Sequence, residues 1–328
     1  MNQIEETPLL AEKIIEGDVR STARLIRLID DGDPSVNEEL RFLYRHAKGA
    51  HIIGFTGSPG VGKSTLVDLI ATKFREEHKT VGILAVDPTS PFTGGAILGD
   101  RVRMQRHFLD DGVFIRSMAT RGSFGGLTRS TADAIVVLDA MGKDAILVET
   151  VGVGQDEVDI VNNAHTTVLV TIPGMGDDIQ AIKAGLMEIG DIFVVNKADR
   201  EGTAKTVKEI RFMLGMSQER REAAGWLPPV IETVALDRTG VDELYKAIID
   251  HRTHLESSSG NALKRVEEER IRNRLLDLLR ENLMVEALRK LGGVQSLEEH
   301  IQEILNKNKD PYGVSLELVA RLLGGLAR

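Results

Sequence analysis

The sequence contains no cysteine, which excludes disulfide bonds and thiolate metal sites. It also lacks any apolar run of the roughly 18 residues that a membrane-spanning helix needs. Residues 1–6 are acidic and do not combine a cationic region with an apolar core, as a secretory signal would. These absences predict a cytoplasmic protein with no membrane partner.

The chain also lacks an excess of positive charge, with 41 Lys and Arg residues against 50 Asp and Glu residues. The formal net charge is -9, which argues against a diffuse basic surface, so we expect no nucleic-acid partner. The 328 residues are 42% hydrophobic and 28% charged, an ordinary globular composition that excludes disordered and fibrous classes. The length suits one sizeable α/β domain with additions.

A glycine-rich segment matches the phosphate-binding pattern G-x-x-x-x-G-K-[ST]. Its residues are Gly57, Ser58, Pro59, Gly60, Val61, Gly62, Lys63 and Ser64. In such a loop, backbone N–H groups surround phosphates, the lysine pairs with β and γ oxygens, and the hydroxyl binds Mg²⁺. The apolar run 51–56 predicts a buried strand before the loop. The stripe beginning at Thr65 predicts a helix whose N-terminus faces the phosphates, so Thr65 is also expected to contact nucleotide.

A second motif, Asn196-Lys197-Ala198-Asp199, follows the apolar run 191–195. It is therefore expected at the carboxyl end of a parallel strand, where open α/β sheets bind ligands. The Asp199 carboxylate can accept hydrogen bonds from the ring N1–H and the 2-amino group of guanine, whereas adenine offers no such pair of donors. We therefore predict GTP and GDP as ligands, with discrimination against ATP of the order of ~10⁴.

Acidic residues are candidates for the metal and hydrolysis site. Most P-loop GTPases carry Asp-x-x-Gly on the strand near Mg²⁺, where this chain has Glu149 and Gly152. Gly152 can offer a backbone N–H to the γ-phosphate. Asp87 and Asp100 are each able to hold Mg²⁺ or orient the attacking water. For Asp87, a cap or turn role before the following proline stays open.

Hydrophobic periodicity divides the chain into three regions. Residues 1–48 form a helical N-terminal extension, and residues 49–256 form an α/β P-loop domain with a mostly parallel sheet flanked by helices. Residues 257–328 show helical patterns only. A long helical tail needs an apolar partner, and a second subunit is the simplest candidate, while a tail folded back on its own domain stays open.

Three segments carry a family resemblance: VDPTS at 86–90, TGGAILGDRVRM at 93–104 and VETVGVGQ at 148–155. The chain resembles the MeaB/ArgK family of GTPases along nearly its whole length. This resemblance implies a homodimer through the helical tail and a role as G-protein chaperone of an adenosylcobalamin-dependent acyl-CoA mutase, most often methylmalonyl-CoA mutase. GTP hydrolysis, slow alone and stimulated by the partner, would gate cobalamin delivery and support release of damaged cofactor.

The resemblance also implies roles for single residues. Lys63 and Ser64 would hold phosphate and Mg²⁺, Glu149 and Asp100 would complete the Mg²⁺ shell, and Asp87 would help to position water. Residues 173–183 resemble an additional switch that rearranges when the mutase binds. Its candidate residues are Gly174, Asp177, Gln180 and Lys183.

Two departures from the family pattern stand out. Thr89 and Ala96 replace the more usual serines of their motifs. Val234-Ala235-Leu236 occupies the place of a Ser-Ala-Leu type of loop that contacts the base. Backbone N–H groups at 234–236 can still reach the guanine oxygen, so we expect weaker side-chain support with specificity retained.

Three other functional classes are alternatives to this hypothesis. A metal-delivery GTPase has a similar core, but the chain lacks cysteine and a His-rich tract. A partition ATPase usually has another lysine where Ser58 and Pro59 stand, and a small-molecule phosphotransferase would need an acceptor pocket. His251 and His254 are spaced as a metal pair, yet we interpret them as a solvated helix end because no ligand cluster accompanies them.

Overall fold

The computed structural model describes residues 9–87, 105–107, 109–119, 126–150, 163–174, 190–216, 225–257, 261–293 and 295–324. The chain forms two compact units, Met1–Arg270 and Ile271–Arg328, and each is described by itself. Helix α13 (Asn261–Leu291) has residues in both units. The domain boundaries expected near residues 48 and 256 stay predictions.

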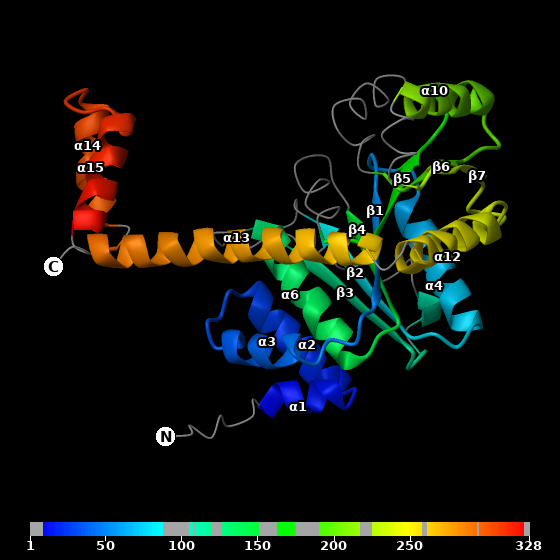
Figure 1. Ribbon diagram of the computed structural model, residues 1–328, viewed down its shortest axis with the longest axis horizontal. Coiled ribbons are helices and arrows are strands. Elements are labelled where there is room, and N and C mark those ends of the chain that lie inside the picture. Colours follow the sequence, from blue (N-terminus) through cyan, green and yellow to red (C-terminus); the bar gives the residue numbers. More distant parts are fainter. Residues whose placement is uncertain are drawn as a thin grey trace. The chain divides into compact units, whose positions relative to one another are not determined.

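The first unit is built around a sheet of seven parallel strands in the order β3-β2-β4-β1-β5-β6-β7 (Figure 1). The strands are β1 (His51–Thr56), β2 (Val81–Asp87), β3 (Val113–Ala119), β4 (Ala145–Thr150), β5 (Thr166–Thr171), β6 (Ile192–Asn196) and β7 (Val230–Thr233). Every residue of β1, β4, β5 and β6 is buried. A strand covered on both faces reads as a continuous apolar run, so the predicted parallel sheet is confirmed.

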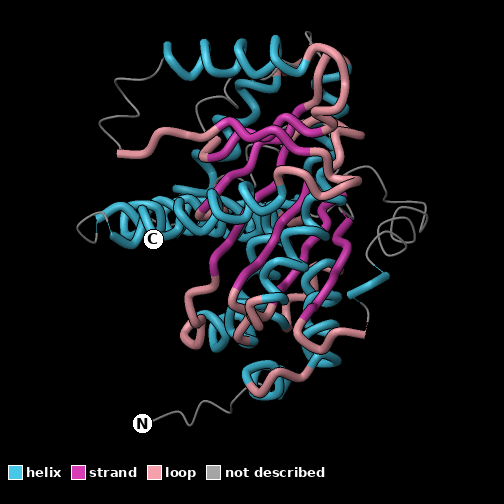
Figure 2. The backbone as a smooth tube through the Cα atoms, turned by 90° about the vertical axis from the view of Figure 1, so that its right-hand side faces the viewer, coloured by secondary structure: helices cyan, strands magenta, loops and turns pink. Residues whose placement is uncertain are grey.

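Helices cover both faces of this sheet (Figure 2). On one face, α4 (Lys63–Glu76) and α12 (Val241–Ser257) share a core with Ile53. On the other face, α6 (Gly126–Met141) packs over Ile52, and α10 (Thr203–Met216) packs over Phe193. Ile52 and Ile53 belong to different cores because successive strand residues point to opposite faces.

Three N-terminal helices pack against α6. They are α1 (Leu9–Ile15), α2 (Val19–Asp30) and α3 (Val36–Tyr44), and the predicted helical extension is confirmed. Asp18 caps α2 by accepting the Ser21 N–H at 2.6 Å, and hydrogen bonding from the Ser21 side chain and N–H lowers the pKa of the Asp18 carboxyl. Glu39 of α3 accepts the Ala11 N–H of α1 at 2.6 Å. These side chains therefore satisfy N–H groups in the first turns of α2 and α1, and Glu39 also joins α3 to α1.

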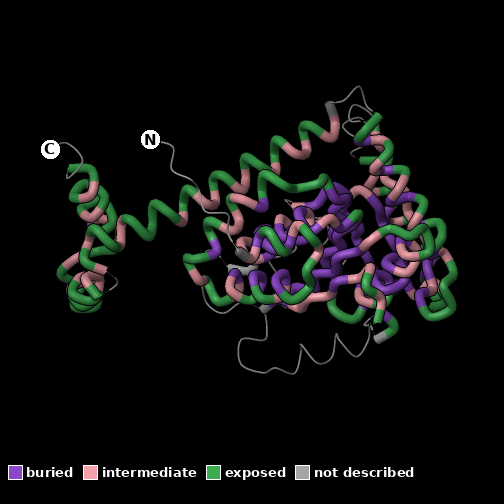
Figure 3. Tube along the Cα trace, turned by 90° about the horizontal axis from the view of Figure 1, so that it is seen from below, coloured by how far each residue is buried: buried purple, intermediate pink, exposed green. Residues whose placement is uncertain are grey.

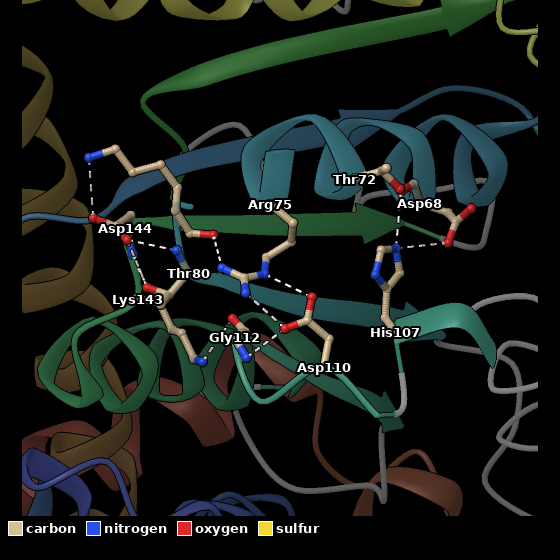
Figure 4. A network of polar contacts seen from close by, with 10 residues as sticks. Asp68, Thr72, Arg75, Thr80, His107, Asp110, Gly112, Lys143 and Asp144 are labelled. Atoms are coloured by element: carbon tan, nitrogen blue, oxygen red, sulfur yellow. Dashed lines mark hydrogen bonds and ion pairs between the residues drawn. The ribbon is translucent and has the colours of Figure 1, made fainter. Parts of the chain in front are cut away.

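Polar side chains join α4 to the amino ends of β2, β3 and β4 (Figure 4). Arg75 donates from Nε and Nη2 to the two carboxylate oxygens of Asp110, both at 2.9 Å. This bidentate pair raises the pKa of Arg75 and lowers that of Asp110. Asp144 accepts the Thr80 N–H at 2.7 Å. These bonds hold together the amino ends of β2, β3 and β4, which lie opposite the carboxyl ends of the strands.

A second polar contact joins α4 to the chain ahead of β3. The buried carboxylate of Asp68 lies 3.1 Å, through Oδ1, from His107 Nε2 and 3.2 Å, through Oδ2, from Arg106 Nε. His107 belongs to a short 3-10 helix, η1 (Gln105–His107), and is itself buried. The contact holds η1 against α4.

The second unit comprises the later part of α13 with α14 (Ser296–Leu305) and α15 (Pro311–Gly324). Many of its large apolar side chains are exposed, whereas those of the first unit concentrate in a buried core (Figure 3). The exposed set includes Ile271, Leu275, Leu279, Leu283, Ile301, Leu305, Leu316, Val319 and Leu323. No helix of the described ranges is long and apolar enough to cross a bilayer.

Candidate nucleotide-binding site

The glycine loop follows β1 directly, and its backbone requires glycine. Gly57, Gly60 and Gly62 have φ values of 137°, 76° and 100°, in the region that side-chain-bearing residues rarely adopt. A Cβ atom on Gly57 would lie 2.0 Å from the carbonyl oxygen of Val170 in β5. A Cβ on Gly62 would lie 2.4 Å from the side-chain nitrogen of Asn196. The loop is thus closely packed against both neighbours.

Lys63 begins α4 and curls back over this loop. Its side chain is buried, and Nζ donates to the carbonyl oxygens of Gly57 and Ser58, the latter at 3.0 Å. The unpaired N–H groups and dipole of a helix N-terminus favour an anion at the same place. The ammonium and the helix end therefore form one anion-binding element.

Ser64 and Glu149 bring two oxygen ligands together. The Ser64 hydroxyl donates to Glu149 Oε1 at 2.5 Å, and Glu149 is only 2% exposed. Glu149 lies beside Phe55 in the parallel ladder between β1 and β4. A hydroxyl and a carboxylate are the hard donors that Mg²⁺ prefers. The described residues contain no cluster of three or more His, Asp or Glu side chains able to hold a metal.

Asn196 joins the phosphate loop to the predicted base loop. Its side-chain nitrogen donates to the Val61 carbonyl at 2.8 Å. Its side-chain oxygen accepts the Thr233 hydroxyl at 3.0 Å and the Ala235 N–H at 3.2 Å. Lys197, with φ of 56°, donates from Nζ to the Gly60 carbonyl at 2.8 Å. Two motifs far apart in sequence therefore form one structure, and the exposed Asp199 follows on the same loop.

The loop after β7 leaves few of its N–H groups for a ligand. Val234 donates to the Thr239 carbonyl at 3.0 Å, and Ala235 donates to Asn196. Leu236 is therefore the remaining candidate donor of the three residues expected to contact the guanine oxygen. Leu236 is 94% exposed and follows Ala235, which bonds to Asn196.

Several predicted site residues lie outside the described residues: Asp100, Gly152, Asp177, Gln180 and Lys183, together with Thr89 and Ala96. The backbone of Asp87 ends β2, opposite Ala119, but its side chain is not described. Gly174 is described just after β5, with φ of 87°. Among the predicted residues, the structure brings together the phosphate loop, Glu149 and the Asn196 loop at the strand carboxyl ends. Val170 and Thr233 support this edge and carry no motif that could have revealed them.

The interpretation of His251 as part of a solvated helix end is wrong. His251 is 3% exposed, and its Nδ1 lies 2.9 Å from the Thr166 hydroxyl at the amino end of β5. Burial lowers its pKa to about 3, with smaller contributions from His254 and His165. The helical spacing revealed the two histidines but not that the face of α12 bearing His251 is covered by the sheet.

A phosphate loop between strand and helix, bonded to an Asn-Lys-x-Asp loop, defines a P-loop GTPase site. Residues 22–291 match the family described as Methylmalonyl Co-A mutase-associated GTPase MeaB, and the chain belongs to this family. A predicted GTPase of Pyrococcus horikoshii is 50% identical over 99% of this chain and 100% of its own length. GTPase ArgK of Escherichia coli is 38% identical over 63% of this chain and 62% of its own.

Two further comparisons concern a eukaryotic relative and the fold. The mitochondrial methylmalonic aciduria type A homolog of Caenorhabditis elegans is 29% identical over 84% of this chain and 68% of its own. The crystal structure of a protein described as LAO/AO transport system kinase superposes with a TM-score of 0.67. It covers 98% of this chain and 99% of that one at 22% identity, so it supports the fold alone.

Proposed function

We propose that this protein is a GTP-hydrolysing chaperone of an adenosylcobalamin-dependent acyl-CoA mutase, methylmalonyl-CoA mutase or a close relative. Hydrolysis would be slow alone, accelerated by the mutase, and would gate loading of cobalamin. The observation that supports this most directly is the bonding of Asn196 and Lys197 to the phosphate loop, in a chain whose family is named for association with that mutase.

Lys63 would act by exchanging partners. Its Nζ now donates to carbonyl oxygens of the loop, and phosphate oxygens would replace them when nucleotide binds. A buried ammonium paired with phosphate stabilises the charge that spreads over the γ-phosphoryl oxygens in the transition state. We assign base selection to Asp199 and a supporting N–H to Leu236. Asp87 and Gly152 keep their proposed roles in positioning water and meeting the γ-phosphate.

Mg²⁺ is the proposed cofactor. Ser64 and Glu149 present a hydroxyl and a carboxylate within 2.5 Å of each other, a donor set that fits this cation, and Asp100 is the proposed further ligand. When bound, Mg²⁺ would neutralise charge on the β and γ oxygens. Because the Ser64 hydroxyl donates to Glu149 here, cation binding would require that bond to lengthen.

We propose that the second unit forms a homodimer. Its exposed leucines include Leu275, Leu279 and Leu283, and exposed apolar area of this extent is typical of a protein interface. A second copy is the proposed partner because a closed two-fold contact pairs the same apolar surface with itself. Leu279→Glu should lower the mass measured by light scattering, whereas exchange of the exposed Arg280 for alanine should not.

The test of the function is GTP turnover by the purified protein with and without candidate adenosylcobalamin mutases, using Lys63→Ala as the blank. Stimulation by one mutase would support the proposal and identify the client. Rapid turnover by the protein alone, unchanged by every mutase, would contradict it. Loading of cobalamin onto the mutase, followed by its absorption spectrum with GTP or with GDP, tests the gating step separately.

A further inference from the structure

A buried histidine holds the amino ends of two central strands together. His165 precedes β5, and its side chain is 2% exposed. Its backbone N–H donates to the Ile52 carbonyl at 2.8 Å, while its Nδ1 accepts the Ile52 N–H at 3.0 Å. One residue therefore satisfies both backbone groups of Ile52 in β1.

The same ring contacts the first part of α13. Because Nδ1 accepts a hydrogen bond, the ring proton must lie on Nε2, which lies 2.5 Å from Glu267 Oε1. Arg270 Nη1 lies 2.9 Å from the same carboxylate oxygen and 2.7 Å from His165 Nε2, so the imidazole, the carboxylate and the guanidinium meet at one point. Burial lowers the pKa of His165, and the hydrogen bond from His165 lowers that of Glu267. The bonds to the Ile52 amide and to the Glu267 carboxylate require a neutral imidazole with its proton on Nε2, and Arg270 then donates to the carboxylate rather than to the ring.

A second row of side chains fixes the neighbouring positions. The Thr166 hydroxyl of β5 lies 2.7 Å from His51 Nε2 of β1 and 2.9 Å from His251 Nδ1 of α12. The amino ends of β1 and β5 are thus bonded to each other and to α12, and His165 adds the bond to α13. These contacts all lie within the first unit.

The opposite ends of the same two strands lead into the nucleotide site. Residue 57, the first glycine of the phosphate loop, follows β1, and residues 173–174 follow β5. The loop and β5 are also in close contact, because there is no room for a Cβ between Gly57 and the Val170 carbonyl. A shift of the loop would therefore press on β5 as well as pull on β1.

We propose that His165 and Glu267 form a clamp that transmits occupancy of the nucleotide site to the first part of α13, residues 261–270. The two strands are buried and hydrogen-bonded along their lengths, so they move as rigid elements. A shift of β1 relative to β5 would change the bonds between Ile52 and His165, and the His165 side chain would pass this change to Glu267 of α13. The inference rests on the proposed binding of guanine nucleotide at the loop, which the experiment measures separately.

The test is hydrogen–deuterium exchange of the full chain with and without GDP. In the wild type, GDP should slow exchange in peptides covering residues 261–270 by about fivefold or more, the lower range of typical coupling. Glu267→Gln should remove this response. Glu268→Gln is the matched control, because Glu268 is on the same helix and its side chain is 56% exposed.

Two substitutions of His165 test its bond to Ile52 and its bond to Glu267 separately. Asparagine places an oxygen near the position of Nδ1, so His165→Asn should retain protection of the Ile52 amide and lose the response of α13. Glutamine places an amide nitrogen near the position of Nε2, so His165→Gln should expose the Ile52 amide and also lose the response. If both variants lose the GDP response at residues 261–270, as Glu267→Gln should, the response depends on the bond between His165 and Glu267. Because His165→Asn keeps the Ile52 amide protected, a local loss of packing would not explain that result.

Binding of a fluorescent GDP analogue is measured on every variant. If GDP binds and the wild-type exchange at residues 261–270 does not change, the clamp proposal is wrong while the proposed nucleotide site stands. A response that persists in His165→Asn and Glu267→Gln would equally overturn the clamp. If GDP does not bind to the wild type, the proposed function itself fails.

Discussion

Polar side chains play different roles at the carboxyl ends and at the amino ends of the parallel strands, here called the carboxyl edge and the amino edge of the sheet. At the carboxyl edge, Lys63 and Asn196 bond to carbonyl groups of a glycine loop whose φ values are left-handed. At the amino edge, His165 and Thr166 bond to a backbone amide and to other buried side chains. At the carboxyl edge, a ligand could replace some of these hydrogen-bond partners. At the amino edge, the buried polar groups satisfy one another's hydrogen bonds.

This difference indicates how one sheet serves both function and stability. In the proposed complex, exchange of partners by Lys63 would cost little, because each bond given up to a loop carbonyl would be replaced by one to a charged phosphate. Breaking a bond at the amino edge leaves a buried donor or acceptor unsatisfied, which costs about 1–3 kcal/mol. Substitutions at the first edge should therefore change ligand binding, and those at the second should change folding.

The largest effect is expected for Asp199→Asn. The asparagine amide would place a donor where guanine presents two donors, so the preference for GTP over ATP should fall by up to ~10⁴, or about 5 kcal/mol. Competition between GTP and ATP for binding measures this preference. The urea midpoint should not change, since Asp199 is exposed. Retained guanine preference would mean that the Leu236 segment selects the base without Asp199.

Lys63→Ala should have the next largest effect. Removing one preorganised charge at the γ-phosphoryl group typically lowers the rate by ~10²–10³, or about 3–4 kcal/mol. Single-turnover GTP hydrolysis at saturating nucleotide measures it. Exchange of the partly buried Lys197 for methionine is the control, because it removes the bond to Gly60 while leaving the Lys63 ammonium in place. Equal loss of rate in both variants would show that the loop, rather than the ammonium, was affected.

Sequence alone predicted the carboxyl edge far better than the amino edge. Fully buried parallel strands read as apolar runs, and the phosphate and base motifs depend on short local spacing, so Lys63, Ser64 and Asn196 could be placed at one edge. The clamp depends on residues 52, 165 and 267, which no local pattern relates. His251 was misread for the same reason, since burial of a helix face is decided by what packs on it.

The third effect is a pH dependence of stability that is specific to the amino edge. His251 has a folded pKa of about 3, against about 6.5 when unfolded. Above pH 6.5 the ring is neutral in both states and the unfolding free energy keeps its full value. As the pH falls toward 3, the unfolded ring binds a proton that the buried ring does not, so the unfolding free energy falls. In His251→Asn, the decline of unfolding free energy between pH 6.5 and 4.5 should be smaller by about 2–3 kcal/mol.

Urea unfolding at pH 6.5, 5.5 and 4.5 measures this slope. The groups that face His251 are His254 on its own helix, His51 of β1, Thr166 and His165 from the β5 segment, and Asp191 at 3.6 Å. His46 is exposed on the surface, and its exchange for asparagine should leave the slope unchanged. Parallel slopes for His251→Asn and wild type would show that this ring accepts a proton without loss of the fold.

The smallest effect separates the two edges most cleanly. Asp110→Asn replaces the charged partner of a bidentate pair with Arg75, whose side chain is 25% exposed, so we expect a loss of about 1 kcal/mol in unfolding free energy. Asp277→Asn, whose partner Arg280 is 76% exposed, should lose less than about 0.5 kcal/mol. GDP affinity should stay within about twofold of wild type in Asp110→Asn, because Asp110 lies at the amino edge. A GDP affinity that fell together with stability in Asp110→Asn would mean that α4 carries strain from its far end to the phosphate loop.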